Sequence, residues 1–311
     1  MIEQDSRWLS FEGIPNNFND FSKKTVPEIY LKPEVHEDIK MSFRVIKRLM
    51  EFSFYEYEFF DVAADNAILV LEMAFKIRYQ ELTGKIWEKK PLHQLIDWHT
   101  KNETLEIYDN SFLETVRTIR NFVAHPNHYG FGGLSMLQWV LHPMDLINDM
   151  YEDIELRRIR INKTRELNNK LKTISKVGCT ISLPNGEKFI VHDIDLLFYN
   201  NKSQANEISV LWQPIFEIPE HWLNDDGLIY GSDFKPLTFS TLEKIENKLI
   251  GKTIDGNIIK IEPINNNQNL KRFKEFNNRF AIYNKHDLYK FSKSTSLGAY
   301  YNQKRRAFHK Q

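Results

Sequence analysis

The hydrophobic pattern of this 311-residue chain changes once, shortly after Leu171. Before that point, apolar residues recur at steps of three and four, which is the period of an amphipathic helix. After it, short runs rich in β-branched and aromatic residues alternate with turn residues, as in 177–183 and 188–192 on either side of Pro184-Asn-Gly186. We therefore expect an α+β multidomain protein, with an N-terminal all-α helical bundle followed by a small β-rich module and a basic C-terminal segment.

Breaks in this pattern divide the chain into four expected segments. Residues 1–33 carry scattered Gly and Pro and no sustained period, which indicates an irregular arm. Residues 34–170 should form the helical domain, and residues 171–263 a β-rich α+β module. Residues 264–311 form the basic segment, which is also rich in aromatic side chains.

Start and stop signals place the expected secondary structure. Gly84 marks the end of a long helix over 59–83. Ser111 is a candidate N-cap, and Glu114 completes a capping box for a helix that should stop near Pro126. Further helices are expected at 34–54, after Pro91 and at 135–169. The β-rich module should hold strands at 194–199 and 208–216, a short helix at 242–250 and a hairpin at 251–261 around Asp255-Gly256.

The net charge of zero conceals a basic C-terminal segment. Residues 266–311 contain eleven Lys and Arg, two acidic residues and nine aromatic residues. Cations that can contact phosphates, interleaved with rings that can stack on bases, are typical of single-stranded nucleic-acid binding. The alternative is a basic helix whose aromatic side chains pack on the protein. The candidate nucleic-acid-binding residues are Lys271, Arg272, Lys274, Lys304, Arg305 and Arg306.

Several classes of protein are disfavoured by the sequence. The first residues are acidic and polar, unlike a signal peptide. The most apolar stretch, 62–75, contains Asp65 and Glu72 and is too short to cross a bilayer. The single cysteine, Cys179, excludes an internal disulfide framework and a multi-cysteine zinc site, and it is expected to be an inert buried thiol. We expect a cytoplasmic protein with no membrane partner and no cofactor.

The motif with the most chemical content lies in the helix expected after Ser111. It reads Arg117-Thr-Ile-Arg120-Asn121-Phe-Val-Ala-His125-Pro126. On a helix, Arg117, Asn121 and His125 follow one another at intervals of four residues and so share a face. Arg120 lies beside that face, about 100° from Asn121. The helix would thus present two guanidiniums, an amide and an imidazole together.

This set of side chains suits metal-free cleavage of RNA by transesterification. The ribose 2′-hydroxyl must lose a proton as it attacks phosphorus, and histidine can carry that proton or protonate the leaving oxygen. Arginine can hold the phosphate and stabilise the charge of the transition state. Asn121 can orient a phosphate oxygen or the imidazole. DNA lacks the 2′-hydroxyl and would not be cleaved.

Arg120-Asn121-x-x-x-His125, after the amphipathic stretch 71–79, resembles the signature of the HEPN superfamily, the higher eukaryote and prokaryote nucleotide-binding domains. The resemblance covers residues 34–166. It implies that Arg120 and His125 are the catalytic pair, with Asn121 as the supporting polar residue. It also implies a metal-independent endoribonuclease that works as a homodimer with a composite cleft, in a toxin–antitoxin or phage-defence setting, with RNA and a possible antitoxin as partners.

Other readings of the same residues remain open. Some members of the superfamily bind nucleotides or RNA, or serve as scaffolds, without cleaving. Structurally, Arg120 could form an ion pair and His125 could cap a helix. Arg117, Glu72 and His128 are supporting candidates, since Glu72 could pair with an arginine of the motif and His128 could border the cleft. Asp61 and Asp65 share one side of their helix and could either pair with an arginine or form a solvated stripe. Metal binding by His125 and His128 is disfavoured, because Pro126 separates them and no third ligand is near.

Overall fold

The computed structural model describes residues 3–87, 91–102, 104, 116, 132–202, 206–217, 234–283 and 288–311. The chain forms two compact units, one of residues 1–154 with Lys310 and one of residues 155–309 with Gln311. We call them the N-terminal unit and the barrel unit. Among the described residues, a search for helices with the length and hydropathy of a membrane span finds none.

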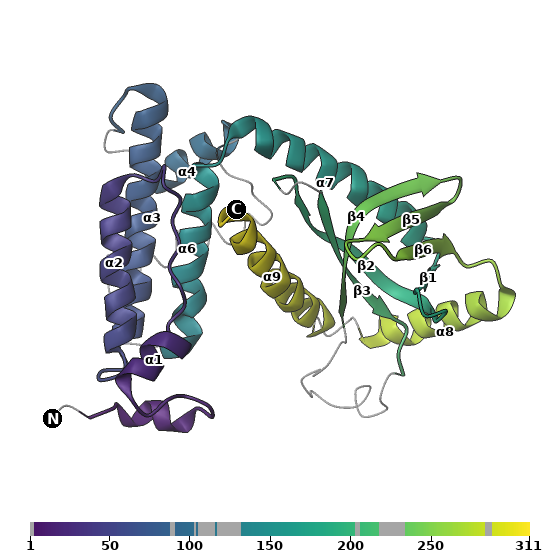
Figure 1. The fold of residues 1–311 in the computed structure, drawn as a ribbon, viewed down its shortest axis with the longest axis horizontal. Coiled ribbons are helices and arrows are strands. Elements are labelled where there is room, and N and C mark those ends of the chain that lie inside the picture. The colour runs from purple at the N-terminus through teal and green to yellow at the C-terminus, as the bar shows by residue number, and fades with distance from the viewer. Residues whose placement is uncertain are drawn as a thin grey trace. The chain divides into compact units, whose positions relative to one another are not determined.

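In the N-terminal unit, every described element is helical (Figure 1). The long helix predicted at 59–83 is confirmed, and it ends at Gly84, whose φ of 68° is a left-handed conformation that glycine adopts without strain. The elements are η1 (Ser6–Ser10), α1 (Phe18–Lys24), α2 (Glu37–Phe52), α3 (Phe59–Thr83), α4 (Leu92–Lys101), η2 (Gly133–Met136) and α6 (Leu137–Met150).

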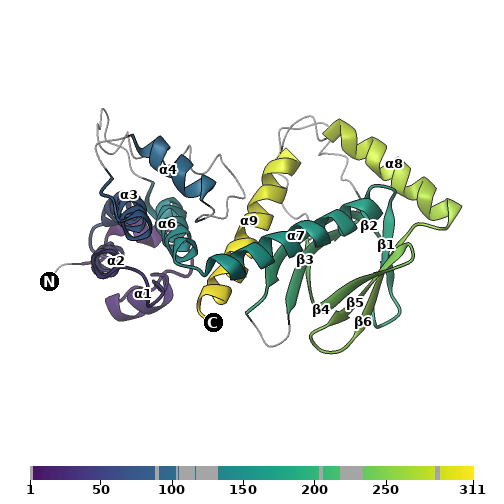
Figure 2. The ribbon, with the colours of Figure 1, turned by 90° about the horizontal axis from the view of Figure 1, so that it is seen from above.

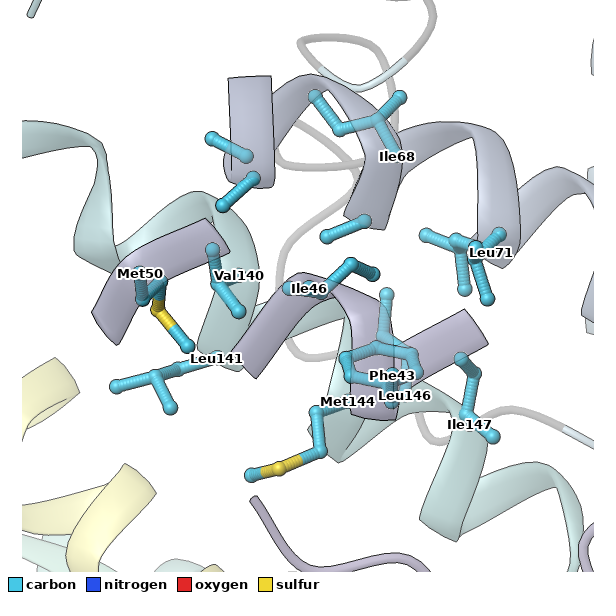
Figure 3. Close-up of a cluster of buried hydrophobic side chains, with 14 of the residues drawn as sticks. Phe43, Ile46, Met50, Ile68, Leu71, Val140, Leu141, Met144, Leu146 and Ile147 are labelled. Carbon is cyan, nitrogen blue, oxygen red and sulfur yellow. The ribbon is translucent and has the colours of Figure 1, made fainter. Parts of the chain in front are cut away.

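The core of the N-terminal unit lies between α2, α3 and α6 (Figure 3). The residues that α2 buries recur at steps of three and four along one face, as its sequence predicts. α3 buries alanines at several positions, which allows its neighbours to approach closely. The side chains that meet in this core include Phe43, Ile46 and Met50 from α2, Ile68 and Leu71 from α3, and Val140, Met144 and Ile147 from α6.

The barrel unit contains a closed antiparallel barrel in which each strand pairs with the next and β1 pairs with β6. Its interior is apolar, with Ile181, Val210 and Ile261 fully or almost fully buried. Helix α7 (Ile154–Ser175) adds Leu167 and Leu171 to the same core. The strands are β1 (Cys179–Ser182), β2 (Lys188–Asn200), β3 (Glu207–Pro214), β4 (Lys235–Ile245), β5 (Lys248–Thr253) and β6 (Ile258–Pro263).

Two C-terminal helices pack on the barrel (Figure 2). α8 (Asn267–Tyr283) buries Phe276 and Phe280 against Leu211 of β3. α9 (Leu288–His309) is fixed on β2 by Lys293, whose ammonium lies 2.5 Å from a carboxylate oxygen of Asp193. It lies 2.6 Å from Asp195 as well, so one cation joins the helix to two positions of the same strand.

The predicted fold class is wrong. The described residues form eight α-helices and a closed six-stranded antiparallel barrel, and not an N-terminal helical bundle followed by a small β-rich module and a basic C-terminal segment. The physical reason is that β1 and β6, about 80 residues apart, pair and close the sheet. Apolar side chains of the barrel are then covered by helices. Helix α7, which precedes the barrel in the sequence, and helices α8 and α9, which follow it, pack against these side chains.

Two predicted helices also differ from the structure. The short helix predicted at 242–250 is wrong, because these residues end β4, turn at Glu246 with a φ of 55° and begin β5. The single helix predicted at 135–169 is interrupted after Met150, so that α6 and α7 are separate. The hairpin predicted around Asp255-Gly256 is confirmed as β5 and β6, and Gly256 has a φ of 85°.

A glycine substitution inside the barrel tests its packing. A Cβ on Gly251 of β5 would lie 2.4 Å from the ring of Phe239, which is fully buried. Gly251→Ala should therefore destabilise the barrel unit by about 1–3 kcal/mol, the usual effect of overpacking. Gly298→Ala is the matched control, because a Cβ there meets no atom within 4 Å and alanine favours the helix α9. Urea unfolding monitored by circular dichroism measures both variants, and equal stability of the two would contradict the packing argument.

Candidate functional site

The motif that carries the predicted chemistry lies outside the described residues. This holds for Arg120, Asn121 and His125, predicted to be catalytic, and for Arg117 and His128, predicted to support them. The structure does describe residues on both sides of the motif. These flanks show how the adjoining chain is attached to the N-terminal unit.

The residue before the motif is held by the core of the N-terminal unit. Val116 immediately precedes Arg117, and only 1% of its surface is exposed. It packs in the core that α2, α3 and α6 share. The residue that precedes the motif therefore belongs to the hydrophobic core of the unit.

The segment after the motif is held by polar groups at the start of α3. The carboxylate of Asp61 accepts hydrogen bonds from the backbone N–H groups of Gly132, at 2.5 Å, and Gly133, at 3.1 Å. The backbone N–H of Leu134 donates to the Tyr57 hydroxyl at 3.2 Å. Gly133 has a φ of 52°, and a Cβ on it would lie 2.0 Å from the Tyr57 ring. The sequence left open an ion pair with an arginine or a solvated position for Asp61, and in the structure its carboxylate binds two backbone N–H groups.

The other acidic side chains on this side of α3 differ in their surroundings. Glu72 is the supporting residue that the structure describes; its side chain is 11% exposed and accepts a hydrogen bond from Lys76 at 2.6 Å. Asp65 is half-buried, and burial together with the charge of Asp61 raises the pKa of its carboxyl. This side of α3 thus offers one carboxylate that binds the backbone, one in an ion pair and one with an increased affinity for protons.

A buried histidine fixes the end of α4 to α3. The ring nitrogens of His99 lie 2.7 Å from the Thr104 hydroxyl and 2.8 Å from the Phe75 carbonyl. Burial lowers the pKa of His99 to about 4, so the ring is neutral at pH 7. Both nitrogens are engaged within the protein, and this histidine is structural.

One group of carboxylates in the described part of the chain has the spacing of metal ligands. It consists of Asp5, Glu56 and Glu58. The guanidinium of Arg7 lies among them, 2.6 Å from Asp5 and 3.2 Å from Glu56, and it also pairs with Glu58. Arg7 keeps the pKa of Asp5 well below its ordinary value and lowers that of Glu58 to about 2. The arginine already supplies the positive charge that a cation would bring.

The predicted nucleic-acid-binding residues fall into two groups. On α9, the Lys304 ammonium lies 2.5 Å from a carboxylate oxygen of Glu207, and Arg305 is buried, with its guanidinium 5.8 Å from the centre of the Tyr301 ring. Arg306 is half-buried. On α8, Lys271, Arg272 and Lys274 are exposed. Of the predicted residues, those on α8 are the ones presented to solvent.

The prediction that Cys179 is a buried thiol is confirmed. Cys179 is fully buried in the barrel core, and burial raises the pKa of its thiol to about 12. It is therefore an unreactive thiol.

Comparison of the chain with known proteins finds no matching family model, no matching curated protein and no matching solved structure.

Proposed function

We propose that this protein is a metal-independent endoribonuclease of the HEPN type, which acts in the cytoplasm as a homodimer in a toxin–antitoxin or phage-defence setting. The observation that carries the proposal is the pattern Arg120-Asn121-x-x-x-His125 in the sequence. Its residue types are those that cleavage of RNA through the 2′-hydroxyl needs without a metal ion.

The proposed reaction assigns one role to each residue. The 2′-oxygen attacks phosphorus as its proton leaves, and the 5′-oxygen departs with a proton, so that the products end in a 2′,3′-cyclic phosphate and a 5′-hydroxyl. His125 carries a proton in one of these steps. Arg120 stabilises the additional negative charge on the phosphate oxygens, and Asn121 orients one of them. Arg117 adds positive charge beside the phosphate.

The described flanks of the motif support the proposal. Catalysis by positioned side chains requires them to be held on a rigid support. Val116 is buried before the motif, and Asp61 holds the backbone of Gly132 and Gly133 after it. The described residues that flank the motif are therefore each held by the N-terminal unit.

The test is cleavage of a mixed RNA pool by the purified protein in EDTA, compared with His125→Ala. We expect cleavage by the unmodified protein, fragments that end in 2′,3′-cyclic phosphate, and a rate at least about 100-fold lower for the variant. His93→Ala is the matched control, because His93 is an exposed histidine of the same unit, and it should cleave like the unmodified protein.

Two results would contradict the proposal. Equal cleavage by His125→Ala would assign the activity to another site or to a contaminant. RNA binding without cleavage by the unmodified protein would favour the alternative function, a non-catalytic HEPN module that binds RNA.

A further inference from the structure

The two units of the chain carry opposite charge. The barrel unit, residues 155–309 with Gln311, contains 25 Lys and Arg against 17 Asp and Glu. The N-terminal unit contains 17 basic and 25 acidic residues. A polyanion would therefore be attracted to the barrel unit.

Most cations of the barrel unit that the structure describes are balanced locally. Lys293 and Lys304 are paired with carboxylates, and Lys163 and Lys170 both bind Glu166. On β4, β5, β6 and the turns between them, five lysines lie among four acids: Lys235, Lys244, Lys248, Lys252 and Lys260 with Glu243, Glu246, Asp255 and Glu262. These positions leave little net charge.

The end of α7 and the first half of α8 differ, because their cations outnumber nearby acids. Lys172 lies in the last turn of α7 and Lys176 directly follows the helix, and both are exposed. Along α8, the one acid is Glu275, whose carboxylate lies 3.8 Å from Lys271. The remaining exposed cations of α8 are Arg272, Lys274 and Arg279.

A glycine brings these two helix ends together. Gly178 lies between α7 and β1, has a φ of 85°, and accepts a hydrogen bond from the backbone N–H of Ile264 at 3.1 Å. A Cβ on it would lie 3.0 Å from the ring of Phe273. Phe273 stands between Arg272 and Lys274 in α8, two residues from Lys271. The end of α7 therefore meets α8 beside its cations, where α7 runs into β1 (Figure 2).

The aromatic side chains of α8 do not share this exposed surface. Phe276 and Phe280 are buried against the barrel, and the two rings stack 5.6 Å apart. By helical geometry Lys271 and Lys274 lie away from these rings, whereas Arg272 lies four residues before Phe276 and is exposed beside them. Phosphate groups can thus reach this surface, and stacking of bases on the buried rings is not possible.

We propose that Lys172 of α7 and Lys176 just after it, together with Lys271, Arg272 and Lys274 of α8, form one surface that binds the phosphodiester backbone of single-stranded RNA. We call it the α7–α8 basic surface. The inference rests on the proposed function for the identity of the ligand, and it assigns substrate holding to the barrel unit. Binding here depends on charge and not on base sequence, and it weakens as salt rises.

The test uses the full chain with His125→Ala, so that RNA binds without being cleaved. Fluorescence anisotropy of a fluorescein-labelled oligoribonucleotide gives Kd between 50 and 200 mM KCl. Adding Lys172→Gln, Lys176→Gln, Arg272→Gln and Lys274→Gln together should weaken binding at least about tenfold at low salt. It should also reduce the slope of log Kd against log salt by about 3, at about 0.7 for each phosphate contact on a single strand.

The matched control removes the same charge from β4, β5 and β6, with Lys244→Gln, Lys248→Gln, Lys252→Gln and Lys260→Gln. It should bind RNA within about threefold of its parent, because only net charge is altered there. Equal losses in the two quadruple variants, or no loss in the α7–α8 variant, would overturn the inference. A DNA strand of the same sequence should bind within about tenfold of RNA, since the surface contacts phosphates.

The two proposals fail in different ways. An absence of RNA binding by the parent overturns the α7–α8 basic surface directly. If the unmodified protein cleaves RNA in EDTA and the α7–α8 variant binds as well as its parent, the proposed reaction stands and the surface does not. Binding lost in the α7–α8 variant alone supports the surface, even where the cleavage test contradicts the reaction.

Discussion

Replacement of Arg120 by alanine is expected to lower the single-turnover rate of RNA cleavage by about 100- to 1,000-fold, which is the usual effect of removing one donor to the developing charge of a transition state. RNA affinity should change by less than about threefold, because most of the binding is proposed to come from the α7–α8 basic surface. The reason for the difference is that Arg120 acts on charge that forms only in the transition state. Rates at saturating protein and Kd from anisotropy, measured on the same RNA, separate the two effects.

The control for this prediction is Arg48→Ala. Arg48 is exposed on α2 in the same unit, so its removal changes the charge of the N-terminal unit equally. It should cleave at the rate of the unmodified protein. Arg120→Lys should recover part of the rate, since lysine keeps the charge but not the two-pronged geometry of guanidinium. A loss of affinity as large as the loss of rate would show that Arg120 binds RNA in the ground state, and the catalytic role would be wrong.

Local signals in the sequence predict the local features of the fold. The apolar period and Gly84 give the bounds of α3, and Asp255-Gly256 gives the turn between β5 and β6. These features depend on neighbouring residues alone. The helix predicted at 242–250 is wrong for the opposite reason. Its composition suits a helix, but residues 242–245 of β4 pair with β5, and β5 in turn pairs with β6, so that both halves belong to the barrel.

Long-range pairing is the part of the fold that the sequence pattern does not reveal. Closure of the barrel joins Cys179 to Pro263, and the pattern of either strand does not name its partner. The sequence pattern likewise does not reveal which acidic residue each basic side chain pairs with. Lys304 pairs with Glu207, which is 97 residues away, while Lys271 pairs with Glu275 on its own helix. In sequence both are simply basic residues of one segment.

The candidate site also has features that are local in the sequence and features that depend on long-range contacts. The motif of Arg120 and His125 is a local pattern and was found in the sequence. The role of Asp61, which holds the backbone 71 residues further along the chain, could not be found there. The one available signal was the pair Gly132-Gly133, since glycine is suited to a left-handed conformation and to close approach.

Acid should destabilise the N-terminal unit through His99. Burial places its pKa at about 4, against 6.5 for an exposed histidine, so the folded state resists protonation. A group whose pKa is lowered on folding contributes stability above its unfolded pKa, and that contribution is lost as the pH falls from 6.5 towards 4. The free energy of unfolding should fall by about 2 kcal/mol between pH 7 and pH 5, and by about 3 kcal/mol in total.

Urea unfolding at pH 7, 6 and 5 measures this dependence in the unmodified protein and in His99→Gln. The glutamine variant loses hydrogen bonds to Thr104 and Phe75 and should be less stable at every pH, so the informative quantity is the change in stability with pH. That change should be about 2 kcal/mol smaller in His99→Gln, whereas His93→Gln, at an exposed position, should retain it. An unchanged pH dependence in His99→Gln would contradict the buried neutral ring.

The barrel unit has a counterpart in His192, whose ring lies edge-on against those of Phe276 and Phe280 and whose pKa burial lowers to about 4. Both units should therefore lose stability over the same pH range, each through a histidine whose pKa is lowered by burial.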